Sequence, residues 1–177
     1  YGGPSGLFLI DKKKANSRPE KISSLRVFNL VQFNDSILWA GTRKGSIFQI
    51  NTHTLKVTSL PILPHTDLYI TYIYPDSHQR IWIGTDNNGL YVSDRNGSII
   101  ASYSKEQLGS NAIKGIIEDE MNNIWVGTGS GLCCINPQME NIDRYTTADG
   151  LPINQFNYSS ACKTVSYTHL TLPTSDL

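Results

Sequence analysis

The sequence has few cysteines, no excess of charge of either sign and no long apolar run. Its 177 residues include three cysteines, fifteen basic residues and fifteen acidic residues. Three cysteines, two of them adjacent, do not make a disulfide framework. Balanced charge removes the usual electrostatic argument for binding nucleic acid or an anionic membrane. Since no apolar run approaches the roughly 20 residues of a transmembrane helix, we expect no membrane contact by this segment.

Motifs of catalysis, cofactor binding and metal binding are equally scarce. The four histidines are scattered, and no Cys/His spacing is typical of zinc. The glycine-rich stretch 127–131 lacks the Gly-Lys-[Ser/Thr] of a phosphate-binding loop, and a strand is expected after it. Glu118, Asp119 and Glu120 are adjacent, whereas a glycosidase needs two carboxyl groups facing each other across a substrate. We therefore predict no catalytic residue, no cofactor and no metal site, and a turn role for these acids.

What the sequence does contain is a repeat built around its three tryptophans. They are spaced 43 residues apart, in the stretches Trp39-Ala40-Gly41-Thr42, Trp82-Ile83-Gly84-Thr85 and Trp125-Val126-Gly127-Thr128. A fixed period of 40–50 residues that contains several short strands is typical of a β-propeller. Because glycine recurs in every copy, we expect that no side chain fits there. The tryptophans are expected to pack between neighbouring blades.

Each period predicts four strands in an antiparallel meander, which is the blade of a propeller. The first strand precedes the tryptophan strand, at 25–33, 69–74 and 112–119. The third and fourth strands are expected at 47–50 and 55–58, at 90–93 and 99–103, and at 132–135 and 141–145. Asp76 and Asp119 each lie six residues before their tryptophan, whereas the corresponding turn of the first copy is two residues shorter. The predicted fold class is all-β.

The period also sets the expected boundaries. They are a partial blade at 1–19, full blades at 20–62, 63–105 and 106–148, and the inner strand of a truncated blade at 149–164. No helix longer than two turns is expected within 20–148. Three full blades are too few to close, so we expect an open fragment with Phe8 and Phe156 exposed on its unpartnered faces. Residues 165–177 break the repeat and are expected to be a non-native tail.

Together these motifs resemble the two-component regulator propeller repeat. The similarity is carried best by 116–145 and by Asp149-Gly150-Leu151-Pro152, and it covers roughly 2–164. The first blade is the weakest match because Lys44-Gly45-Ser46 replaces the usual Gly-Gly-Leu. The resemblance implies a periplasmic sensor region of a membrane histidine kinase, as in hybrid two-component systems of Bacteroidetes. It implies the remaining blades and kinase domains of a parent chain as partners, and an oligosaccharide as a frequent ligand.

Three loops lead into the inner strands at the same point of the repeat, so we expect them to gather on one face near the propeller axis. Aromatic, amide and hydroxyl groups suit sugar binding, in which rings stack and sugar hydroxyls need hydrogen bonds. The alternative is that the asparagines and serines only shape turns. The candidate ligand-binding residues are His65, Asp67, Tyr69, Asn111, Asn154, Asn157 and Tyr158.

Two other functions stay open at this point. The first is a propeller of a glycan-active enzyme, because some lyases and glycoside hydrolases carry similar Trp-x-Gly-Thr repeats. A convergent pair of acids or a cluster of metal ligands would favour that alternative. The second is a protein-interaction propeller, although the Gly-His and Trp-Asp signatures of the WD40 class are absent.

Overall fold

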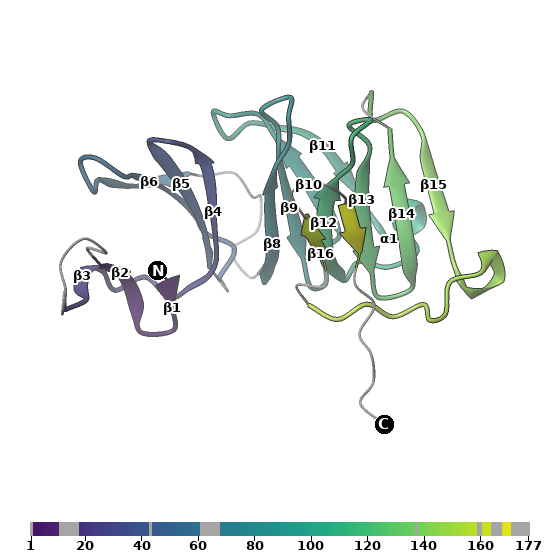
Figure 1. Ribbon diagram of the computed structural model, residues 1–177, viewed down its shortest axis with the longest axis horizontal. Helices are drawn as coiled ribbons and strands as arrows, with labels where there is room; N and C mark the ends of the chain where they lie inside the picture. The colour runs from purple at the N-terminus through teal and green to yellow at the C-terminus, as the bar shows by residue number, and fades with distance from the viewer. Residues whose placement is uncertain are drawn as a thin grey trace. The chain divides into compact units, whose positions relative to one another are not determined.

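The computed structural model describes residues 2–10, 18–42, 44–60, 68–136, 138–158, 161–163 and 168–170. These residues form antiparallel sheets (Figure 1). Within the described residues the helices are a single turn, α1 (Lys105–Leu108), and a 3-10 turn, η1 (Thr147–Asp149). The expected absence of a longer helix is therefore confirmed for this part of the chain. The chain divides into two compact units, 1–70 and 71–177.

The first unit contains a three-stranded sheet and one complete blade. The sheet is β1 (Gly2–Gly3), β2 (Gly6–Leu9) and β3 (Glu20–Ser23), and blade one is β4 (Val27–Asn34), β5 (Ile37–Thr42), β6 (Ile47–Asn51) and β7 (Val57–Leu60). Because β3 pairs with β2, residues 20–23 extend the partial blade rather than open blade one. β7 begins two residues later than expected, since Leu55 adopts a φ of 57° in the preceding turn.

The second unit contains two complete blades in the predicted meander order (Figure 1). Blade two is β8 (Ile70–Pro75), β9 (Ile81–Thr85), β10 (Leu90–Ser93) and β11 (Ile99–Tyr103); its first residue is the last of the first unit. Blade three is β12 (Ile113–Glu118), β13 (Ile124–Thr128), β14 (Gly131–Ile135) and β15 (Ile142–Tyr145). Trp82 of blade two and Val126 of blade three belong to one buried cluster, so the two sheets pack face to face. This confirms the expected packing for Trp82.

The glycine of the tryptophan motif makes room for a side chain from the segment that follows its blade. A Cβ on Gly84 would lie 2.6 Å from Cγ2 of Ile113, and one on Gly127 would lie 3.3 Å from Cγ of Phe156. Ile113 and Phe156 follow their glycines at the same distance along the chain, so the contact repeats. Phe156 is only 2% exposed, and the expectation that it would be exposed is wrong because its ring rests on Gly127. Phe8 is half-buried.

The segment after blade three is less regular than predicted. A capping box between Thr146 and Asp149 caps the N-terminus of η1, and Gly150 at its C-terminus adopts a left-handed φ of 97°. The chain continues without a strand to residue 158, so the inner strand expected over 149–164 is limited to β16 (Ala161–Lys163), which packs beside β12. β16 pairs with β17 (Thr168–Leu170). The non-native origin of 165–177 stays a prediction, and its other residues lie outside the described part.

Candidate ligand-binding surface

The connections that lead into β4, β8 and β12 define one end of each blade, which we call the loop end. The opposite end, where the first two strands of a blade are joined, is the turn end. The loop end of blade one carries a pocket of about 830 Å³. It is lined by the start of β4, the end of β5, the turn that follows β5, and the start of β6, together with Pro4 of the β1–β2 turn and Tyr69 just before β8.

This pocket combines aromatic rings, hydroxyls and positive charge. Its rings are Phe28, Phe48 and Tyr69, and its cations are Arg26 and Lys44. Phe28 and Tyr69 are 45% and 48% exposed, so the edge of the pocket offers ring surface to solvent. Ser24 and Ser46 add two hydroxyl groups, whereas the buried Thr42 hydroxyl already donates to the backbone carbonyl of Ser46. Such a lining can stack on an apolar ring face and hydrogen-bond to polar groups around that ring.

Of the residues predicted from the sequence, Tyr69 belongs to this pocket. His65 and Asp67, which precede it, lie outside the described residues. Sequence reasoning missed Arg26, Phe28 and Lys44 because blade one matches the repeat least well. The position in the repeat could have pointed to Arg26, because the stretch before β4 corresponds to the three loops that were chosen as the candidate ligand-binding face.

In the second unit, Tyr158 lies against two charged residues at the loop end. Its hydroxyl donates a hydrogen bond to Oδ1 of Asp86, which follows β9. Nζ of Lys114, on β12, lies 3.3 Å from the same oxygen and 3.7 Å from the centre of the Tyr158 ring. The hydrogen bond from Tyr158 and the ammonium of Lys114 together lower the pKa of Asp86, against the opposing effect of burial. We call these three residues the tyrosine cluster.

The tyrosine cluster joins blade two, blade three and the segment that follows them. Its carboxylate and ammonium neutralise each other, and one face of the Tyr158 ring is covered by Lys114. Tyr158 nevertheless stays 55% exposed. The cluster therefore fixes the C-terminal segment onto the blades and leaves part of an aromatic ring at the surface.

The predicted asparagines divide into different roles. Asn154 uses its amide within its own loop, because Oδ1 accepts from the Thr147 backbone N–H and Nδ2 donates to the Thr147 hydroxyl. This is the turn-shaping role given as the alternative. Asn157 is exposed. The backbone carbonyl of Asn111 accepts from Gly89, while its Oδ1 is buried and has no hydrogen-bond partner within the described residues.

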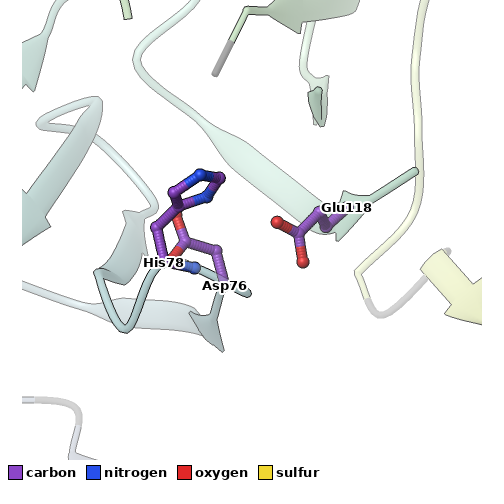
Figure 2. A group of neighbouring side chains, drawn as sticks. All are labelled: Asp76, His78 and Glu118. Atoms are coloured by element: carbon purple, nitrogen blue, oxygen red, sulfur yellow. The ribbon is translucent and has the colours of Figure 1, made fainter. Parts of the chain in front are cut away.

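The turn end of the second unit brings together Asp76, His78 and Glu118, a group that sequence reasoning did not predict. Figure 2 shows Asp76 and His78 on one turn with the Glu118 carboxylate facing them from β12. One nitrogen or oxygen of each side chain lies within 4.8 Å of the others, as in a set of metal ligands. Only their position in neighbouring blades brings them close, which is why residue spacing gave no signal.

The hydrogen bonds of this group favour a structural role. Oδ1 of Asp76 accepts from the backbone N–H groups of His78 and Arg80, and Oδ2 accepts from Arg80 Nε and Trp82 Nε1. Glu118 accepts from the backbone N–H and the hydroxyl of Ser77 in the neighbouring blade. Four donors occupy the lone-pair positions of the Asp76 carboxylate, and a metal ion there would face the Arg80 guanidinium.

Asp119 repeats the arrangement in blade three. Its Oδ1 accepts from the backbone N–H groups of Met121 and Asn123, and its Oδ2 accepts from Asn123 Nδ2 and Trp125 Nε1. Burial raises the pKa of Asp119, but these hydrogen bonds outweigh it and the net shift is downward. The turn role predicted for this acid is confirmed, while Glu118 instead links two blades.

The two adjacent cysteines are poor nucleophiles. Burial raises the pKa of both Cys133 and Cys134 to about 11, so the reactive thiolate is scarce at neutral pH. Both are free thiols, and Sγ of Cys133 donates to the backbone carbonyl of Leu108.

Neither helix in the described residues has the length and apolar character needed to span a membrane.

Comparison with known proteins agrees with this architecture. The family model described as two component regulator propeller matches residues 65–87 and 107–130. A curated relative, histidine kinase P4 of Formosa agariphila, is 26% identical over 84% of this chain. The aligned region is 15% of that relative, so this chain spans a small part of its length.

Solved structures show the same fold. The extracellular domain of a hybrid two component system from B. thetaiotaomicron matches 94% of this chain and 23% of its own, with a TM-score of 0.74 at 24% identity. The extracellular domain of a one component system from the same organism matches 94% of this chain and 25% of its own, with a TM-score of 0.76 at 21% identity. Virginiamycin B lyase from Staphylococcus aureus is more distant, with a TM-score of 0.67 at 17% identity over 88% of this chain and 52% of its own.

The family match falls on the repeated strands of blades two and three. Both matched stretches contain the connection that leads into an inner strand, that strand and the following tryptophan strand. Residues 65–87 and 107–130 therefore resemble two-component regulator propeller repeats, and the fold is similar to that of the extracellular domains of a hybrid two component system and of a one component system.

Proposed function

We propose that this chain is a ligand-sensing part of a two-component sensor, that it lies in the periplasm, and that its ligand is an oligosaccharide. The remaining blades and the kinase domains of a parent chain are its proposed partners. On this proposal the chain binds its ligand without chemical turnover. The similar structures support the sensor role, since two of them are the extracellular domains of a hybrid two component system and of a one component system.

One observation carries the oligosaccharide proposal, namely the pocket at the loop end of blade one. Phe28 and Tyr69 offer exposed ring surface beside the hydroxyl groups of two serines, a combination that suits a sugar ring with its apolar face and its rim of hydroxyls. The acids at the turn end of the second unit do not support catalysis. Both Asp76 and Glu118 are held by structural hydrogen bonds rather than presented to a substrate.

The test is titration of the chain with a panel of oligosaccharides, measured by calorimetry, followed by the variants Phe28→Ala and Tyr69→Ala. Each variant is expected to weaken binding about fivefold, because stacking of one ring contributes on the order of 1 kcal/mol. Ile100→Ala is the matched control, since Ile100 is 48% exposed, like Tyr69, but lies on β11. Binding that survives both aromatic substitutions, or glycan cleavage by the wild-type chain, would contradict the proposal.

A further inference from the structure

We infer that the pocket of blade one takes an acidic saccharide, one whose sugar ring carries a carboxylate or a sulfate group. This inference rests on the proposed function and names the class of ligand. It follows from the sign of the charge around the pocket. Arg26 and Lys44 line it, whereas no acidic residue is among the described residues of its wall.

Within the described residues, no carboxylate neutralises these two cations. Neither Arg26 nor Lys44 forms an ion pair in this part of the structure, and both side chains are exposed. The acids described in the first unit are Glu20 and Asp35. Asp35 lies at the turn end of blade one, beyond the far end of β4, and Glu20 begins β3 at the end away from the pocket. Among the described residues, the positive charge of the pocket is therefore not neutralised by an acid.

The two units also differ in net charge: the first unit is basic and the second is acidic. Residues 1–70 contain nine basic and four acidic residues, whereas 71–177 contain six basic and eleven acidic residues. The sum is the formal balance of fifteen basic and fifteen acidic residues. The loop end of the second unit illustrates the contrast, because Asp86 neutralises Lys114 there. A field of one sign around a pocket raises the local concentration of ligands of the opposite sign.

The two cations favour an acid group on the ligand, and the aromatic rings favour a sugar ring. Arginine and lysine form charge-assisted hydrogen bonds to carboxylate and sulfate oxygens, which are about twice as strong as neutral ones. Phe28, Phe48 and Tyr69 add apolar surface that a small inorganic anion cannot use. A ring that carries an acid group satisfies both, whereas a neutral sugar leaves the cations unused.

The experiment compares ligands that differ in charge alone. Oligogalacturonate and its methyl ester share their sugar rings, and a sulfated galacto-oligosaccharide with its unsulfated parent forms the second pair. We expect the acid of at least one pair to bind about tenfold more tightly than its neutral form, with affinity falling as salt is raised. The pair that shows the larger difference identifies the acid group as carboxylate or sulfate.

Variants then assign the effect to the pocket. Arg26→Gln and Lys44→Gln are each expected to remove most of the preference for the acidic ligand. Lys56→Gln removes the same charge from an exposed site in the β6–β7 turn and is expected to leave the preference unchanged. A preserved melting transition shows that each variant is folded.

The outcomes separate this inference from the proposed function. Equal binding of the acidic and neutral forms, weakened by Tyr69→Ala but not by Arg26→Gln, would overturn the acidic ligand and keep the oligosaccharide sensor. A preference for acids that survives both charge substitutions would overturn the assignment to this pocket. Absence of binding by every saccharide would overturn both.

Discussion

Blade one differs from blades two and three at both of its ends. At the turn end, Trp82 and Trp125 each donate their indole N–H to an aspartate six residues earlier. The residue six positions before Trp39 is Phe33, whose ring centre lies 6.1 Å from that of Trp39. Trp39 Nε1 is buried and has no hydrogen-bond partner within the described residues. Blade one therefore keeps the fold without the polar link that the other two blades share.

The loop ends differ in a corresponding way. In the second unit, Asp86 neutralises Lys114 and holds Tyr158 in place. In blade one, Arg26 and Lys44 line a pocket without a carboxylate partner among the described residues. One repeat therefore supports two uses: satisfied polar groups join blades two and three, while the less regular blade one carries the candidate binding site.

The largest effect is expected when the polar link of blade two is broken. Asp76→Ala removes the acceptor for Trp82 and leaves the Arg80 guanidinium, 12% exposed in its side chain, without its carboxylate. Removing one partner of a buried ion pair costs about 3–5 kcal/mol, so we expect a loss of that size in the free energy of unfolding, measured by urea denaturation. Asp35→Ala, in the exposed turn of blade one, is the control with an expected change below about 0.5 kcal/mol. A loss below 1 kcal/mol for Asp76→Ala would contradict the link.

A smaller effect is expected at Gly84 and Gly127, which make room for Ile113 and Phe156. Gly84→Ala forces a Cβ against Ile113, and overpacking of this kind costs about 1–3 kcal/mol. Gly127→Ala meets Phe156 at a longer distance and is expected to cost less. Thermal unfolding of both variants measures the difference. Equal costs would show that the two junctions are equally tight.

The contrast between the tryptophans is tested by removing the indole N–H. Trp82 and Trp39 are both fully buried, so the loss of packing is matched in Trp82→Phe and Trp39→Phe. Trp82→Phe also loses a hydrogen bond to Asp76, whereas Trp39→Phe removes an N–H with no described partner. We expect Trp82→Phe to be about 1 kcal/mol more destabilising in urea denaturation. A larger cost for Trp39→Phe would indicate that its indole nitrogen does contribute to stability.

The smallest effect concerns pH. The folded pKa of Asp119 is below its ordinary value, so its contribution to stability is complete above the unfolded pKa of about 3.9 and is lost as pH falls through the folded pKa. The wild-type melting temperature should therefore decrease more steeply on acidification below that value than that of Asp119→Asn, which has no carboxyl group to protonate. Parallel pH profiles would contradict the role of the carboxylate.

The sequence predicted the fold where the repeat is regular. The strands over 90–93 and 99–103 match β10 and β11, because apolar runs and glycine turns specify them locally. The segment 149–164 was predicted less well, since the capping box of Thr146 and Asp149 and the seat for Phe156 on Gly127 replace a strand. Of the candidate site, Tyr69 was found by its place in the repeat. Arg26 and Lys44 were missed because their significance depends on a pocket assembled from separate strands.

We propose that the ligand binds in the pocket of blade one rather than at the tyrosine cluster. The most direct measurement is a map of amide chemical shifts as the chain is titrated with an oligosaccharide. We expect shifts at Arg26, Phe28, Lys44 and Tyr69, with little change at Asp86, Lys114 and Tyr158. Shifts confined to the tyrosine cluster, with none in the pocket, would contradict it.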